Sequence, residues 1–484
     1  MALYETFASE IEKSIRDGVL RVGDKLPSVR DACSSRGVSP STVFQAYYLL
    51  EARGLIRARP RSGYYVSARA EPLPPEPGAS CPDGESTELA ISERIFDILG
   101  SVRNRNVVPL GSAFPSPLLF PLPRLAQAMA AHLKRQDPLD TVEDLSPGNP
   151  ALRRQIALRY LIAGINIPAS DIVVTNGALE ALNLCLQAVT RPGDTVIVEA
   201  PTFYGALQAL ERQGLKALEV PTHPRTGMDL HALENAIARH RPAACRLMTQ
   251  FQNPLGSLMP DERKRQLVEL LARHDIPLIE DDVYGELYFG ATRPVPAKAY
   301  DTQGLVLHCS SFSKCLAPGY RIGWASAGRY TQRVQRLKLS STLSASGPAQ
   351  GAIAEFLEQG GYDRHLRRLR DTLQAQQARM ATEVAHAFPA GTRMTRPQGG
   401  FFLWLELPQG IDALALHRQA LARGISVAPG PIFSASGQFA SALRLNCGHP
   451  WNEAQAKAVR TLGELALAAL ARPRPEARGL TLGP

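Results

Sequence analysis

The stretch "SSFSKCLAPGYRIGW", residues 310–324, places one lysine among three serines and seven residues ahead of an arginine. Apolar runs at 306–309 and 322–324 flank it and indicate that it is buried. Burial penalises the charged form of an amine and lowers its pKa, which makes Lys314 a candidate nucleophile able to form a Schiff base. The serine hydroxyls and the guanidinium of Arg321 are groups that bind phosphate.

A nucleophilic lysine beside a phosphate-binding group is the combination that pyridoxal 5'-phosphate requires. The stretch therefore predicts this cofactor, with Lys314 as the residue that carries it. The alternative is that Lys314 is a structural lysine held in an ion pair, which leaves the serines and Arg321 without a role.

The whole chain has 484 residues, with 44% hydrophobic and 20% charged residues, and is too long for one core, so two or three domains are expected. We expect no membrane span and no signal peptide, because no apolar run is long enough and the N-terminus is amphipathic. The seven cysteines are scattered without a CxxC pair, which favours reduced thiols and a cytoplasmic location over disulfides or a metal site. The net charge of +9 permits a polyanionic partner.

Composition divides the chain into four regions. Residues 1–66 are helical in pattern, and residues 67–90 are rich in Pro, Glu, Gly and Ser, which predicts a flexible linker. Residues 91–470 alternate short strand-like runs with helical stretches, the pattern of an α/β fold with a mostly parallel sheet. Residues 471–484 are predicted to be a disordered tail.

The first region predicts three helices followed by a hairpin. The first helix runs from about Tyr4 to Arg16, the second is capped at Ser28, and the third is capped near Ser39 and stops at Gly54. This is helix-turn-helix spacing, in which the third helix reads DNA. The run "GLIRARPRSGYYVS", residues 54–67, predicts a hairpin with a basic tip.

The run "GDKLPSVRDACSSRGVSPSTVFQAYYLLEARGLIRARPRSGYYV", residues 23–66, resembles the GntR-type winged helix-turn-helix domain. The resemblance covers residues 1–66 and implies binding to double-stranded operator DNA. The alternative is an interaction module that no longer binds DNA. The residues that the resemblance implies as DNA contacts are Arg30, Ser39, Ser41, Thr42, Arg61 and Gly63.

A strand-like run at 172–174 is followed by a glycine turn and an amphipathic helix. The N-terminus of such a helix offers backbone N–H groups to an anion, here from Gly177, Ala178 and Leu179. On its own this is a weak signal, because any strand–helix unit can turn on glycine.

Three carboxylates, residues 280–282, follow the apolar strand that ends at Leu278 and Ile279, in "IPLIEDDVYGELYFG". The carboxyl end of a strand is where α/β proteins bind ligands. We interpret Asp281 as the partner of a protonated pyridine nitrogen and Tyr284 as a donor to a ring oxygen. The alternative is that these carboxylates cap a helix, and we favour that reading for Asp282.

The motifs "TNGALEAL", "EAPTFYG", "NPLG", "EDDVYG", "SSFSKCLAPGYRIGW", "PQGGFFLWLELP" and "LRLNCG" together resemble the aminotransferase class I/II family of fold-type I pyridoxal phosphate enzymes. The resemblance implies a large parallel-sheet domain plus a smaller C-terminal α+β domain, with a substrate carboxylate bound by Arg444. It implies Lys314 as the Schiff-base lysine. The other cofactor contacts that it implies are Gly177 and Ala178, Phe203, Asn253, Asp281, Tyr284, Ser311, Ser313 and Arg321.

A winged helix followed by an aminotransferase-like domain resembles the MocR-type subfamily of GntR regulators. This resemblance implies a homodimeric, pyridoxal phosphate-dependent transcriptional regulator that senses an amino compound through aldimine exchange at Lys314. The alternative is a working aminotransferase with a DNA-binding appendage. In many relatives the partner subunit places a tyrosine near the phosphate, but the corresponding segment, 140–154, contains no tyrosine.

Overall fold

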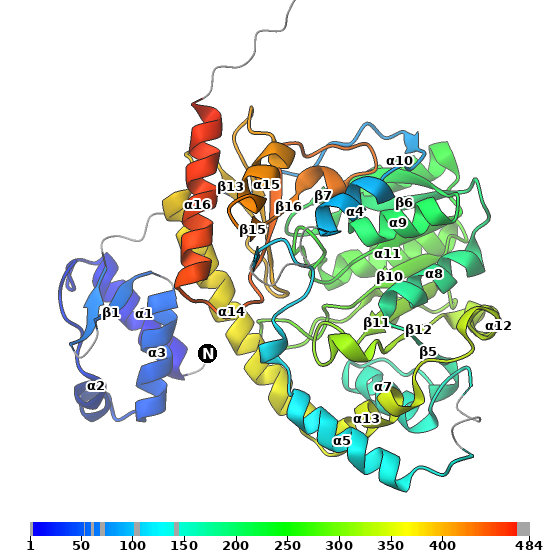
Figure 1. Ribbon diagram of the computed structural model, residues 1–484, viewed down its shortest axis with the longest axis horizontal. Helices are drawn as coiled ribbons and strands as arrows, with labels where there is room; N and C mark the ends of the chain where they lie inside the picture. The colour runs from blue at the N-terminus through cyan, green and yellow to red at the C-terminus, as the bar shows by residue number, and fades with distance from the viewer. Residues whose placement is uncertain are drawn as a thin grey trace, which may run out of the picture.

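The protein is described here by a computed structural model that covers residues 3–52, 54–59, 62–67, 73–100, 107–139 and 145–471 (Figure 1). Within these ranges, no helix combines the length and the apolar character needed to cross a membrane. Arg61 and residues 472–484, which hold nearly all of the predicted tail, lie outside the described residues.

The N-terminal unit consists of three helices and a hairpin, as predicted. Ser28 and Ser39 stand at the starts of the second and third helices, where each side chain accepts a backbone N–H, from Asp31 at 3.1 Å and from Thr42 at 3.2 Å. The apolar faces of the helices form a small core around the buried Val43, Tyr47 and Leu50. The elements are α1 (Leu3–Arg16), α2 (Val29–Arg36), α3 (Pro40–Ala52), β1 (Ile56–Arg59) and β2 (Gly63–Val66).

The large domain is built on one sheet whose central strands are parallel. Three strands depart from the parallel pattern: β12 is antiparallel to both of its neighbours, and the short β3 and β8 are each antiparallel to β7. A short connection allows two neighbouring strands to pair antiparallel, and residues 312–322, within the 310–324 stretch, connect β11 to β12. In spatial order the strands are β3 (Ser86–Thr87), β7 (Lys216–His223), β6 (Thr195–Ala200), β9 (Ala244–Leu247), β10 (Leu278–Asp281), β11 (Val306–Ser311), β12 (Gly323–Ser326) and β5 (Ile172–Thr175), with β8 (Gly227–Met228) on β7.

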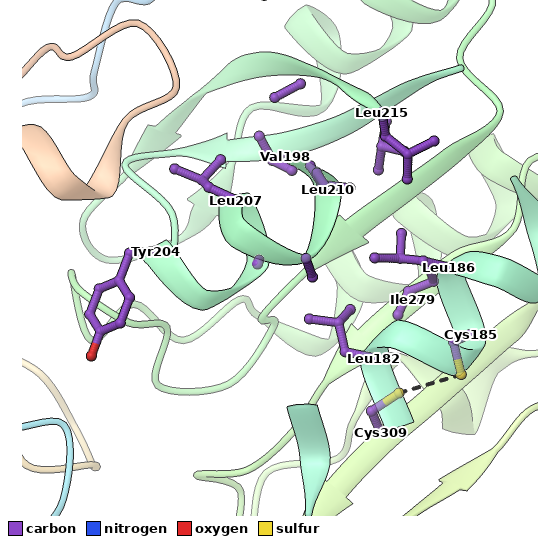
Figure 2. Packing of buried hydrophobic residues seen from close by; sticks show 14 of the residues in the cluster. Leu182, Cys185, Leu186, Val198, Tyr204, Leu207, Leu210, Leu215, Ile279 and Cys309 are labelled. Carbon is purple, nitrogen blue, oxygen red and sulfur yellow. Dashed lines mark hydrogen bonds between the residues drawn. The ribbon is translucent and has the colours of Figure 1, made fainter. Parts of the chain in front are cut away.

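Helices cover both faces of this sheet (Figure 1). Figure 2 shows part of one face, where α8 and α9 pack on the strands and the Cys309 thiol donates to the Cys185 sulfur at 3.6 Å. Burying a leucine such as Leu182 or Leu207 contributes about 1.5–3 kcal/mol. The helices are α4 (Ser92–Gly100), α5 (Leu122–Arg135), α7 (Pro150–Ile162), α8 (Ala178–Val189), α9 (Tyr204–Arg212), α10 (Leu230–His240), α11 (Asp261–Arg273), α12 (Thr331–Thr342) and α13 (Gly347–Glu358).

The smaller domain follows and has its own sheet and core. Apolar residues of its two central strands, among them Leu403 and Leu443, pack against α14 and α16. The sheet order is β13 (Arg393–Met394), β14 (Phe402–Glu406), β17 (Ala442–Asn446) and β16 (Ala428–Pro429), beside the pair β15 (Ile425–Ser426) and β4 (Val108–Pro109). The helices are α14 (Tyr362–Ala387), α15 (Ala413–Leu421) and α16 (Glu453–Leu470).

Residues 73–90, which we assigned to a flexible linker, instead lie along the two C-terminal domains. The carbonyl of Pro75 accepts from the Met394 N–H at 2.9 Å, and β3 adds antiparallel to the edge strand β7. The Ser80 N–H bonds the Thr222 carbonyl at 3.2 Å. The segment has no hydrophobic core of its own, but its backbone is hydrogen bonded to the edges of distant strands. Composition does not reveal such pairing.

The winged helix lies beside α14, the long helix at the junction of the other two domains (Figure 1). The guanidinium of Arg379 on α14 lies 4.8 Å from the ring of Tyr48 and 3.9 Å from the carboxylate of Glu51, both on α3. Gly54 packs on Thr382, where an added Cβ would sit 3.0 Å from the threonine methyl. We call this contact between α3 and α14 the docking face.

Candidate cofactor site

Lys314 lies just beyond the end of β11, at the carboxyl edge of the sheet. Its amine donates to the Ala113 carbonyl at 2.9 Å and sits 3.6 Å from the centre of the Phe114 ring. Burial, the largest cause, acts together with the positive charges of Arg444 and Arg321 to lower the pKa of this amine to about 7, although the carboxylate of Asp281 acts in the opposite direction. A large fraction of the amine is therefore neutral and nucleophilic near pH 7.

The start of α8 and the side chain of Arg321 form an anion cradle. Gly177 precedes the helix at φ +86° with no side-chain cap, so the first backbone N–H groups of α8 face outward. Arg321 makes only long contacts, to Ser313 Oγ at 3.3 Å and the Asn176 carbonyl at 3.4 Å, and no described carboxylate pairs with it. A Cβ on Gly177 would fall 2.5 Å from the guanidinium, so this approach requires glycine.

The opposite end of the site is acidic and aromatic. One oxygen of Asp281, Oδ2, accepts from Arg246 at 2.5 Å, while the other, Oδ1, is buried without a partner among the described residues. An unpaired buried carboxylate oxygen is costly unless something donates to it. The amide of Asn253 donates to the Tyr284 hydroxyl at 3.3 Å beside it.

The predicted cofactor residues come together at one cavity. They reach it from β10, the β11–β12 connection, the start of α8 and the loops after β6 and β9. A phosphate fits the cradle, and a protonated ring nitrogen fits the orphaned Asp281 oxygen, so the residues fit pyridoxal phosphate. The predicted residues that line the cavity are Ala178, Leu179, Phe203, Asn253, Asp281, Tyr284, Ser311, Ser313, Lys314 and Arg321, and Gly177 lies against Arg321.

Arg444 is fully buried in β17, next to this cavity. Its guanidinium donates to Asn253 Oδ1 at 3.0 Å and to the carbonyls of Gly111 and Ser112 at 2.6 and 3.1 Å. It also lies 4.2 Å from the Phe402 ring, and no carboxylate of the described chain pairs with it. A buried cation balanced only by neutral dipoles and ring faces is suited to a ligand carboxylate.

Sequence reasoning missed Arg246, which holds Asp281 from the neighbouring strand. Arg246 is 1% exposed, and its guanidinium also lies 4.0 Å from Glu199, whose pKa burial raises to about 8. The sequence did contain a signal for a buried arginine at this position. The run "ACRL" puts Arg246 inside an apolar strand, in the same way as "ALRLN" does for Arg444. Phe114 and Ala113, which cover Lys314, were also missed.

The predicted DNA contacts within the described residues lie in the first turn of α2, around the start of α3 and on the hairpin. Arg30 and Ser41 are exposed, and Gly63 opens β2 at φ +103°. The hydroxyl of Ser39 lies 2.8 Å from that of Ser41 and 2.9 Å from that of Thr42. Arg61 lies outside the described residues.

Two family models match the chain: "Bacterial regulatory proteins, gntR family" over residues 3–66, and "Aminotransferase class I and II" over residues 106–460. An uncharacterised HTH-type transcriptional regulator of Escherichia coli, YdcR, is 48% identical over 465 residues, which are 96% of this chain and 99% of that protein.

Solved aminotransferases share the fold of the two C-terminal domains. A multiple substrate aminotransferase of Thermococcus profundus superposes with a TM-score of 0.72 at 27% identity, over 78% of this chain and 96% of that one. The alpha-aminoadipate aminotransferase of Thermus thermophilus, solved in complex with N-(5'-phosphopyridoxyl)-L-leucine, has a TM-score of 0.70 at 30% identity, over 79% of this chain and 100% of that one.

Proposed function

The chain belongs to the aminotransferase class I and II family and carries a GntR-family domain at its N-terminus, and from this premise we propose that it is a pyridoxal phosphate-dependent transcriptional regulator. One observation carries the proposal: α14 touches both functional regions. Near its start, His365 Nε2 lies 2.7 Å from the carbonyl of Cys315, the residue after Lys314. Fourteen and seventeen residues further on, Arg379 and Thr382 contact the winged helix.

Each end of the cofactor has a matching set of side chains. Arg321, Ser313 and the start of α8 would hold the phosphate, and Asp281 would keep the ring nitrogen protonated. When bound, pyridoxal phosphate supplies an electrophilic carbon that exchanges the lysine amine for the amine of a small molecule. Lys314 provides the neutral amine for that exchange because its pKa lies near 7.

The small molecule is proposed to be an amino compound that carries a carboxylate. Arg444 is the buried cation that would bind this carboxylate, and it lies beside Asn253 and Tyr284 in the cofactor site. Binding there would displace the backbone carbonyls of Gly111 and Ser112 from the guanidinium. Residues 111–114, which contact Arg444 and also cover Lys314, would then have to move.

We propose double-stranded operator DNA as the macromolecular partner and a homodimer as the assembly. Leu133 on α5 and Leu161 and Ile162 on α7 are exposed apolar side chains that a partner subunit could cover, and burial of such groups favours association. Light scattering coupled to gel filtration measures the mass in solution, and a monomeric mass contradicts this part of the proposal.

The test compares two readouts on one preparation of the full chain loaded with pyridoxal phosphate. Operator fragments selected from the neighbouring intergenic DNA are titrated with and without a panel of amino acids, and transamination of the same panel with a keto acid is followed in parallel. If the chain is a regulator, its affinity for the operator should change when one of the amino compounds is added. If every compound leaves operator affinity unchanged while transamination turns over steadily, the chain is instead an aminotransferase with a DNA-binding appendage.

A further inference from the structure

A second cavity opens between the start of α5 and the first three turns of α14, separate from the cofactor site. Its volume is 260 Å³, compared with about 30 Å³ for one water molecule in the liquid, so it has room for a small molecule. Leu118, Leu119, Phe120 and Leu369 form apolar walls, and the polar lining consists of Arg124, Arg364, His365, Arg368 and Thr372.

The charge around this cavity is of one sign. Three arginines line it, no carboxylate does, and within the described residues none of the three has an ion-pair partner. The nearby acids are engaged elsewhere: Asp363 pairs with Arg159 at 2.6 Å, and Glu355 pairs with Arg135. Like charges held close together repel one another, so the cluster is suited to a bound anion.

The start of α14 adds to this positive potential. Gly361 precedes the helix without a side-chain cap, and a Cβ added there would lie 2.4 Å from the Arg124 guanidinium. Arg124 therefore lies over the first turn of a 26-residue helix, where the backbone carries partial positive charge. Burial lowers the pKa of His365, and the charges of Arg368 and Arg124 lower it further, which fits a cluster with no counter-ion of its own.

We propose that this cavity is a second anion site, for a small organic molecule that bears phosphate or another multiply charged oxyanion. Planar guanidinium groups bind phosphate and carboxylate oxygens in pairs, which matches Arg124, Arg364 and Arg368. The apolar walls contact the organic part of the ligand.

The site is connected to both functional regions. His365 is hydrogen bonded to the carbonyl of Cys315, next to Lys314, and the far half of the same helix carries the docking face. A bound anion raises the pKa of His365 and favours its protonated form. Occupancy of the cavity therefore acts on the hydrogen bond that ties α14 to the lysine segment.

Isothermal titration of the full chain tests the proposal, with pyrophosphate as the probe and citrate as a second arm that distinguishes phosphates from polycarboxylates. The chain is first saturated with pyridoxal phosphate, which occupies the cofactor's own phosphate cradle. We expect one pyrophosphate per chain, and a Kd at least about tenfold weaker for Arg368→Ala and for Arg364→Ala, because each removes a charge-assisted hydrogen bond.

Arg367→Ala is the matched control, because it removes the same charge from the same turn of α14 without touching the cavity. Binding within twofold of wild type in this control supports the site. Three results overturn the proposal: neither pyrophosphate nor citrate binds, Arg367→Ala and Arg368→Ala weaken binding equally, or Arg321→Ala alone abolishes it. The last result places the anion in the cofactor cradle.

Discussion

The cofactor site and the docking face both depend on arginines, but the two regions hold them in different ways. Arg246 and Arg444 are essentially fully buried, and what balances their charge is fixed inside the fold. Arg379 on the docking face is about one quarter exposed, and so is its partner Glu51, 3.9 Å away. A buried ion pair that loses one member costs about 3–5 kcal/mol, whereas an exposed pair is worth about 0–1 kcal/mol.

This difference suits the proposed division of labour. A site that recognises one chemical structure needs fixed, desolvated charges, because these penalise a wrong ligand most strongly. A contact that switches must have two states close in energy, since a ligand shifts an equilibrium only by its differential affinity, typically about 1–3 kcal/mol. If the contact between α3 and α14 were much more stable than this, binding of a small molecule could not break it.

The largest expected effect is at Lys314. Lys314→Ala should remove visible absorbance from protein incubated with pyridoxal phosphate, because no other described lysine stands in the cofactor cavity. In the wild type, borohydride should fix the cofactor's mass on the peptide that contains Lys314. The peptide with Lys298, another buried lysine, is the internal control. A mass shift on that peptide, or an unchanged spectrum in the variant, contradicts the assignment.

Next in size is Arg246. Arg246→Ala leaves the carboxylate of Asp281 buried without its partner, so we expect the free energy of unfolding to fall by about 3–5 kcal/mol. Urea unfolding measures it. Arg329→Ala, which removes an exposed guanidinium 2.7 Å from Asp275, is the comparison and should cost at most about 1 kcal/mol. Equal losses in the two variants would mean that burial does not decide how much stability an arginine ion pair contributes.

Arg444→Gln should act on ligand choice. The variant should still bind pyridoxal phosphate through Lys314, and it should lose about 10- to 100-fold in affinity for amino compounds with a carboxylate, the size of one charge-assisted interaction. Spectral titration measures the affinity of each protein for an amino acid and for the matching amine that lacks the carboxylate. The amine should bind wild type and variant alike. If affinity for the two ligands falls equally, Arg444 has a structural role.

A smaller, roughly tenfold, effect is expected from pH. The pKa of Lys314 is lowered to about 7, so its nucleophilic neutral form is scarce below pH 7 and predominates above it. The rate of covalent attachment to the cofactor-free chain should therefore rise about tenfold between pH 6 and 8 and level off above. Stopped-flow absorbance follows the rate. A rise that continues to pH 10 would mean an unshifted lysine.

The sequence predicts well which residues meet at the candidate cofactor cavity, because each stands in a short local motif. Lys314, Ser313 and Arg321 share one strand connection, and Gly177 shares a turn with the start of its helix. Arg246 escaped because its role depends on strand register. It lies opposite Ile279, and Asp281 is two residues further on the same face of the sheet. Composition alone does not give the pairing of β9 with β10, which brings together residues 35 positions apart.

The residues through which the winged helix docks on α14 were beyond sequence reasoning for a related reason. Tyr48, Glu51 and Arg379 are residue types that are common on helix surfaces, and nothing in their local sequence indicates that α3 meets α14. The linker was misjudged because its residues 73–90 pair with edges formed by distant strands. Local motifs therefore predicted the residues of the candidate cofactor site, and only the tertiary structure shows which surfaces join the winged helix to α14.

The smallest expected effect is the one that tests this connection. Arg379→Ala removes a cation–π contact with Tyr48 and an exposed ion pair with Glu51, together worth about 1 kcal/mol, or about fivefold. If docking is what the effector biases, the ratio of operator affinities with and without effector should change by up to about fivefold, while unfolding stability and binding to non-specific duplex stay near wild type. Arg329→Ala, which removes a surface guanidinium far from α3 in sequence, controls for net charge, since DNA affinity depends on phosphate neutralisation. Both variants are titrated with operator and non-specific duplex at one salt concentration. If the ratio changes equally in Arg379→Ala and Arg329→Ala, or in neither variant, the docking face does not carry the response to effector. The winged helix would then respond through another contact.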